Sequence, residues 1–90
     1  MYADQIFKEG HNNPSAYKDK ELLVKGTVKE IHTLSDSVVV WLWAGSFSKV
    51  QCVFNTIPTG VKVGDTVIVQ GVFKGSSDTW VELAECKIVN

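Results

Sequence analysis

The sequence has no arginine, and all nine of its basic residues are lysine. With ten acidic residues the net charge is −1. Dedicated nucleic-acid binders usually carry a strongly basic surface, so this composition weighs against that class, although lysines can cluster locally on a neutral protein. No apolar run approaches the roughly 20 residues needed to span a bilayer, and Met1 leads directly into a polar segment without a signal peptide. These features fit a cytoplasmic protein, or a mature fragment without its leader.

Cysteine is also scarce, and this limits the chemistry that the chain can perform. Cys52 and Cys86 are its two cysteines, and neither has a Cys or His at the spacing of a zinc site. We therefore expect no metal and no cofactor. His11 and His32 lie outside any Ser/His/Asp or His-Glu-x-x-His pattern. Without a nucleophile–base pair or a phosphate-binding loop, we expect a binding protein and not an enzyme.

The N-terminal residues 1–20 are expected to form a helical segment that packs on the remaining part of the domain, residues 21–90. Good helix formers occupy residues 3–9, and Gly10 would end this helix. Asn13 and Pro14 then suit the N-cap and the first position of a second, single-turn helix.

Residues 21–90 alternate apolar and polar side chains with a period of two, which predicts a mainly β structure. The five expected strands cover residues 21–32, 38–43, 47–54, 65–74 and 79–89, with a hairpin turn at residues 75–78. The apolar set changes phase near Lys29–Glu30 and again at Ala84–Glu85, so a β-bulge is expected at each place.

Five strands with bulges favour a small barrel, because bulges let a short sheet curl and close on itself. The connector of residues 55–64 lies between the third and fourth strands. This arrangement predicts a five-stranded OB-fold barrel, closed or partly open, with an SH3-like barrel as the alternative. The connector is short for the helix usually found there, so we expect a turn or one helical turn.

The second strand has two different faces, and only one of them fits inside a small barrel. Its aliphatic residues suit the interior better than its two indoles do. The outward set on the second and third strands is Trp41, Trp43, Phe47, Lys49 and Gln51. Trp80 could reach the same rim, and Lys25 and Lys29 could extend it as a basic stripe. OB-folds bind oligonucleotides and oligosaccharides on this surface, where each base stacked on an aromatic ring contributes roughly 1–3 kcal/mol.

Other interpretations of these residues remain open. The tryptophans could pack against the N-terminal segment or form a dimer interface, since large exposed apolar patches usually mark contacts. The lysines of the first strand could be solvated charges. Cys52 and Cys86 are both expected to point inward on neighbouring strands. A disulfide between them would contribute about 3–4 kcal/mol and would indicate an oxidising compartment; the alternative is two separate core residues.

Several segments resemble the tRNA-anti-like family of OB-fold proteins. They are YKDK at 17–20, VKGTV at 24–28, VQCVF at 50–54, VGDTVIVQG at 63–71 and VELAECKI at 81–88. The resemblance covers about residues 13–90 and implies an OB-fold, and the family's name implies a likeness to anticodon-binding domains. Many members look like small bacterial proteins that are exported or anchored outside the cytoplasm, some as lipoproteins.

Two functional hypotheses follow from these observations. The first is a non-catalytic module that binds single-stranded nucleic acid through the outer face of the second and third strands. The alternative is an extracytoplasmic module that binds a protein or a small ligand. A homodimer that uses the same tryptophans is a third arrangement, and no membrane span is expected in this chain.

Overall fold

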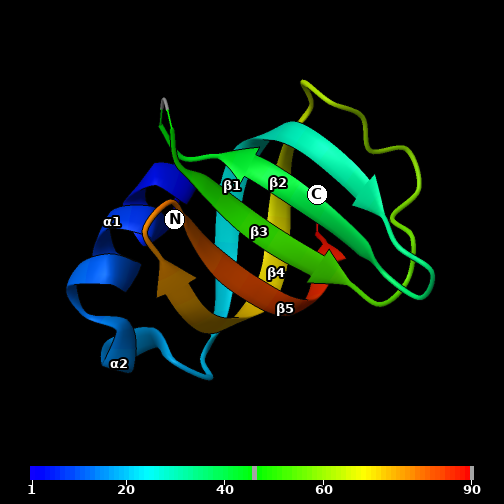
Figure 1. Ribbon diagram of the computed structural model, residues 1–90. Helices are drawn as coiled ribbons and strands as arrows, with labels where there is room; N and C mark the ends of the chain where they lie inside the picture. Colours follow the sequence, from blue (N-terminus) through cyan, green and yellow to red (C-terminus); the bar gives the residue numbers. More distant parts are fainter. Residues whose placement is uncertain (46, 90) are drawn as a thin grey trace.

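Five strands of this protein close into one barrel (Figure 1). The computed structural model describes residues 1–45 and 47–89. The elements are α1 (Ala3–Asn12), α2 (Pro14–Tyr17), β1 (Glu21–Thr33), β2 (Val38–Trp43), β3 (Lys49–Phe54), β4 (Thr66–Ser77) and β5 (Trp80–Ile88). The strand order around the barrel is β1-β2-β3-β5-β4. The β3–β5 pair is parallel, and the other four pairs are antiparallel. The predicted five-stranded OB-fold is thereby confirmed.

Both predicted bulges are present and have the expected effect on the core. The β1–β2 register shifts between Val28 and Glu30. In β5, Glu85 adopts a left-handed φ of 53° at the shift in register with β4. This extra residue brings Cys86 back to the interior side already occupied by Leu83, and both side chains are buried.

Some strand boundaries differ from the prediction. β3 begins at Lys49 and not at Phe47, and β4 continues to Ser77. A second register shift, between Phe73 and Gly75, adds one residue to β4 and lets it stay paired with β5. The hairpin turn therefore lies at residues 78–79 and not at 75–78. Within the described residues, the β3–β4 connector contains turns and no helix.

The prediction that Gly10 ends the first helix is wrong, because α1 continues through it to Asn12. Gly10 is instead a packing position. A Cβ atom there would lie 2.9 Å from Cε2 of Phe73 and 3.2 Å from Cγ1 of Val81. Glycine thus allows the helix backbone to approach the barrel closely. The second helix begins as predicted, with Asn13 at the N-cap and Pro14 at the first position.

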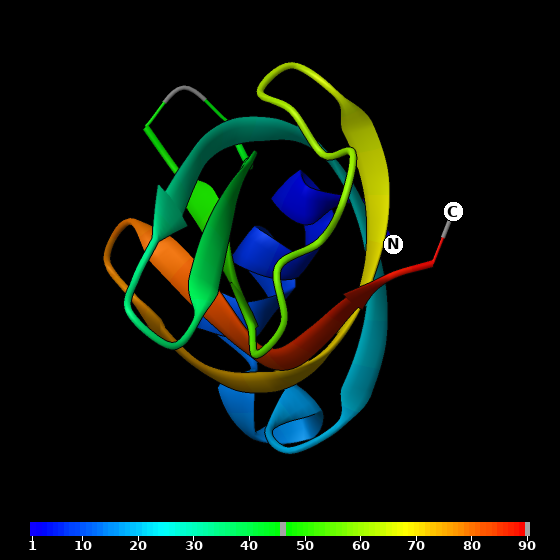
Figure 2. The same cartoon turned by 90° about the vertical axis from the view of Figure 1, so that its right-hand side faces the viewer.

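Helix α1 lies at one end of the barrel, where it is visible through the barrel in Figure 2. Its residues Ala3 and Ile6 belong to the buried core, and Phe7 and Tyr17 pack against that core. A Cβ atom on Gly26 of β1 would lie 3.0 Å from Cβ of Ala3, so the helix start also approaches the barrel wall closely. The apolar residues of the N-terminal segment thus pack at the end of the barrel. The outer surface of β2 remains available for other contacts.

Candidate functional site

Six outward side chains of β2, β3 and β5 form two cross-strand rows on the barrel surface. One row is Trp43, Lys49 and Trp80, and the next is Trp41, Gln51 and Glu82. Neighbouring strands are roughly 4.8 Å apart, and residues two apart along a strand are separated by roughly 6.7 Å. The intervening residues Leu42, Val50 and Val81 are fully buried, as strand alternation requires. We call the six outward residues the outer grid.

Two lysine ammonium groups lie over the indole rings of the outer grid. Lys49 Nζ is 3.3 Å from the ring centroid of Trp41 and 5.8 Å from that of Trp80. Lys29, at the bulge of β1, places its Nζ 4.8 Å from the Trp43 ring and 5.7 Å from the Trp41 ring. All four distances are within the roughly 6 Å of a cation–π interaction. The structure thus brings Lys29 together with the aromatic residues.

Trp41 also contacts the imidazole of His32. The two ring centroids are 4.4 Å apart, and His32 Nε2 lies 3.1 Å from Glu30 Oε1. The other oxygen of Glu30 is 4.0 Å from Lys29 Nζ. Trp41 is therefore in contact with both His32 and Lys49, whereas Trp43 is 45% exposed. In the unbound protein, Trp43 offers a more accessible indole surface than Trp41.

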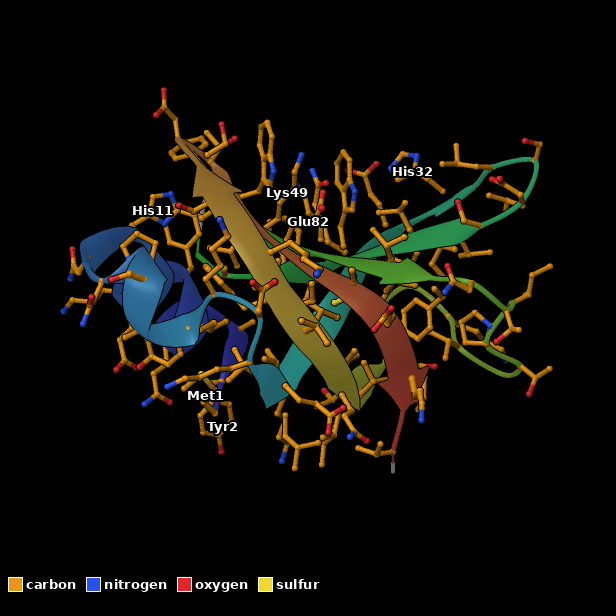
Figure 3. All side chains as sticks on the ribbon, turned by 90° about the horizontal axis from the view of Figure 1, so that it is seen from below. Met1, Tyr2, His11, His32, Lys49 and Glu82 are labelled. Carbon is orange, nitrogen blue, oxygen red and sulfur yellow. The ribbon has the colours of Figure 1, made fainter. Side chains whose placement is uncertain are left out.

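Sequence reasoning missed Glu30, His32 and Glu82. A local signal for each was present, because Glu30 and His32 alternate outward after the β1 bulge and Glu82 lies two residues after Trp80. Figure 3 shows Lys49, Glu82 and His32 along one side of the barrel, while Met1 and Tyr2 lie on the opposite side.

Two other predicted site residues are not part of the outer grid. Lys25 donates its backbone N–H to the Met1 carbonyl at 2.7 Å, and its Nζ lies 5.9 Å from the Tyr2 ring. Lys25 lies away from the outer grid because β1 changes its partner strand along its length. Residues Glu21 to Thr27 pair with β4, whereas Val28 to Thr33 pair with β2. Phe47 is 89% exposed and lies in the β2–β3 loop.

The charges on this surface are balanced. Two lysines, Lys29 and Lys49, are matched in number by two glutamates, Glu30 and Glu82, and Glu30 already lies beside Lys29 and His32. Within residues 1–45 and 47–89, no hydrogen bond or ion pair joins the side chain of Gln51 or Glu82 to another residue. Both side chains are half-buried. Gln51 and Glu82 are thus polar side chains beside the indoles, and both can form hydrogen bonds with a ligand.

Cys52 and Cys86 are buried free thiols, so the structure contains no disulfide between them. Cys86 Sγ donates a hydrogen bond to the Leu83 carbonyl at 3.4 Å. A hydrogen bond with Cys86 raises the pKa of Cys52 well above its ordinary value of 9.0, and burial adds to the rise. Both cysteines point inward as predicted, but as neighbouring core thiols they give no support to an oxidising compartment.

The raised pKa of Cys52 predicts a loss of stability at alkaline pH. The folded protein holds this proton more tightly than the unfolded chain, so the stabilisation is complete below the unfolded pKa and is lost as pH rises through the folded pKa. We expect the free energy of unfolding to fall above about pH 9, and to fall less in Cys52→Ala. Urea titrations under reducing conditions between pH 7 and pH 10 measure both slopes.

The comparison depends on the slopes with pH, because Cys52→Ala also loses packing at every pH. Tyr17 also lowers the free energy of unfolding at alkaline pH, because its hydrogen bond to Glu9 raises the tyrosine pKa from 10.0. This effect is the same in the wild type and in Cys52→Ala. Identical pH dependence in the two proteins would show that the Cys52 thiol makes no contribution.

A separate pocket of about 390 Å³ lies between the β3–β4 connector and the end of β5. Its lining includes Ile57 and Pro58 from the connector, and Cys86 and Lys87 from β5. Lys87 is its one charged residue, whereas the outer grid holds both Lys49 and Glu82. The part of the chain that the structure describes has no cluster of three potential metal ligands. It also has no helix that is long and apolar enough to cross a membrane.

Comparisons with known proteins agree with this architecture. A model of the tRNA_anti-like family matches residues 3–87. A search of curated proteins gives no match. A crystal structure from Klebsiella pneumoniae, described as a "putative nucleic acid-binding lipoprotein", is similar with a TM-score of 0.77 and 19% sequence identity. The match covers 99% of this chain and 90% of the other. At this identity, the likeness establishes a shared fold.

Proposed function

This chain belongs to the tRNA_anti-like family, and we propose that it is a non-catalytic OB-fold module that binds single-stranded nucleic acid through its outer grid. The observation that carries the proposal is the placement of three indoles on one outer surface, with Lys29 and Lys49 within 6 Å of their rings. The similar protein from Klebsiella, which is described as a "putative nucleic acid-binding lipoprotein", supports it.

Stacking provides most of the binding energy in this proposal. Trp43 and Trp80 stand two strands apart in one row, which corresponds to roughly 10 Å between their backbones. Each base stacked on an aromatic ring contributes roughly 1–3 kcal/mol whatever its sequence. An exposed cation–π contact contributes only about 0.5–1 kcal/mol. A base can therefore displace Lys49 from the Trp41 ring, and the released ammonium can then contact a phosphate.

The proposal predicts a weak but measurable dependence of affinity on salt. If Lys29 and Lys49 each contact one phosphate, log K falls with log salt with a slope of about −1.4 for a single strand. Between 50 and 200 mM salt, this slope corresponds to about a sevenfold loss of affinity. Quenching of the intrinsic tryptophan fluorescence by single-stranded DNA and RNA measures it directly. A flat signal at micromolar protein and excess oligonucleotide would contradict the proposal.

Two lysine variants give a matched comparison in the same titration. Lys49→Ala removes one of the proposed phosphate contacts and should reduce the slope to about −0.7. Lys25→Ala removes the same charge on the side where Tyr2 lies, and it should leave the slope unchanged. If both variants change the slope equally, the salt dependence reflects net charge and not the outer grid.

The alternative function is the binding of a protein or a small ligand outside the cytoplasm. The Klebsiella protein is described as a lipoprotein, which supports an extracytoplasmic location for this chain too. Fractionation of cells that express the full reading frame tests the location. If the fluorescence titration is flat, sedimentation of the protein alone tests whether a second copy covers the tryptophans instead.

A further inference from the structure

Glu82 is the one carboxylate in the outer grid, and it is available for a ligand. It lies across from Gln51 of β3 in register and two residues after Trp80 on the same face of β5. Within the described residues, its carboxylate has neither a hydrogen-bond donor nor an ion-pair partner. Glu30 differs in this respect, because His32 and Lys29 already lie beside its two oxygens.

A free carboxylate on a nucleic-acid surface is poorly suited to the phosphate backbone. Glu82 repels phosphate oxygens at neutral pH, because both groups are negatively charged and both only accept hydrogen bonds. The edges of bases offer the complementary chemistry. Carboxylates accept hydrogen bonds from exocyclic amino groups such as N4 of cytosine, and a Gln amide can pair with N6 and N7 of adenine. The Gln51–Glu82 pair is thus suited to base edges.

The register of the strands places these two side chains where a stacked base would reach them. Trp80 and Glu82 alternate on one face of β5, so they are roughly 6.7 Å apart along the strand. Lys49 and Gln51 have the same relation on the neighbouring strand. A base that stacks on Trp80 with its polar edge towards the next row of the outer grid therefore reaches Gln51 and Glu82.

We infer that the outer grid selects bases that carry an exocyclic amino group over thymine and uracil. This inference rests on the proposed function. Adenine, cytosine and guanine each offer an amino group to Glu82. An exocyclic amino group projects from the ring and carries two N–H donors. Thymine and uracil have one N–H donor on this edge, and it lies within the ring between two projecting carbonyl oxygens, which repel the carboxylate. Because hydrogen bonds to charged groups are the stronger ones, the preference for amino-bearing bases should be about tenfold or more.

The test compares labelled oligo(dC), oligo(dA) and oligo(dT) of equal length by fluorescence anisotropy at one low salt concentration. Wild-type protein should bind the first two about tenfold or more tightly than the third. Glu82→Gln keeps the shape of the side chain, removes its charge and adds a donor. In this variant the preference should fall to within about twofold, with oligo(dT) bound at least as tightly as by the wild type.

Glu21→Gln is the matched control, because it removes one negative charge from the part of β1 that pairs with β4. It should keep the full preference. Equal binding of the three oligonucleotides by the wild type would overturn the inference and leave the proposed function standing. A preference that persists in Glu82→Gln would overturn the role of Glu82. Failure of all three to bind would overturn the proposed function, and the inference with it.

Discussion

Replacing Trp43 and Trp80 together with alanine is expected to weaken the binding of single-stranded nucleic acid by about thirtyfold or more. Each indole supplies a stacking contact of roughly 1–3 kcal/mol, and every 1.4 kcal/mol corresponds to about a factor of ten in affinity. Trp43 is 45% exposed and Trp80 is half-buried on the outer surface, so their loss should leave the core intact. Anisotropy of a labelled oligonucleotide measures the effect without relying on the removed fluorophores.

Tyr2→Ala is the control for this double variant. Tyr2 is 60% exposed and lies on the opposite side of the barrel from Lys49 (Figure 3). Its removal takes away an exposed aromatic ring outside the outer grid, and the affinity should stay close to that of the wild type. A double variant that is folded by circular dichroism and binds with full affinity would exclude the indoles as the stacking surface.

Phe73→Ala is expected to lower the free energy of unfolding by about 3–5 kcal/mol. Phe73 is fully buried, and its ring lies 6.2 Å from the Tyr17 ring, between centroids. It also fills the space beside Gly10 of α1. A domain of this length has a total stability of about 5–14 kcal/mol, so the variant should lose roughly a fifth of it or more. Urea denaturation followed by circular dichroism measures the change.

Phe47→Ala removes the same side chain from a position that is 89% exposed. Substitutions at such surface positions usually change stability by no more than about 0.5 kcal/mol. The two phenylalanine variants therefore separate the contribution of burial from that of residue type. Similar losses in both would contradict the assignment of Phe73 to the core that joins the helices to the barrel.

The strands were predictable because their signal is local. Alternation places Val38, Val40 and Leu42 on one side of β2 and both indoles on the other, whatever the partner strand is. A change of phase within a strand is equally visible in the sequence, and it located the bulges of β1 and β5 correctly, although not the register shift between Phe73 and Gly75 of β4. The same local logic correctly placed both cysteines inside. It could not show whether two inward thiols form a disulfide, because that depends on how the strands pair and on the oxidation state of the two sulfurs.

The role of Gly10 could not be inferred in this way. A glycine at the end of a run of helix formers usually marks a helix end. Here the side chains of Phe73 and Val81, more than 60 positions further along the chain, occupy the space that a Cβ would need. The sequence predicts a short helix, but not that this helix enters the barrel end. Only packing between distant segments determines that position.

The outer grid shows the same division between local and distant information. The amino-acid sequence is sufficient to predict an OB-fold with Trp41, Trp43 and Lys49 facing outward, since outward placement follows from alternation within each strand. It does not separate Lys29 from Lys25, although both alternate outward on one long strand. That separation arises because β1 pairs first with β4 and then with β2, so the coiling of the closed barrel carries the two lysines to different sides. Strand pairing across the barrel is non-local, and it places Lys29 and Glu82 beside the indoles.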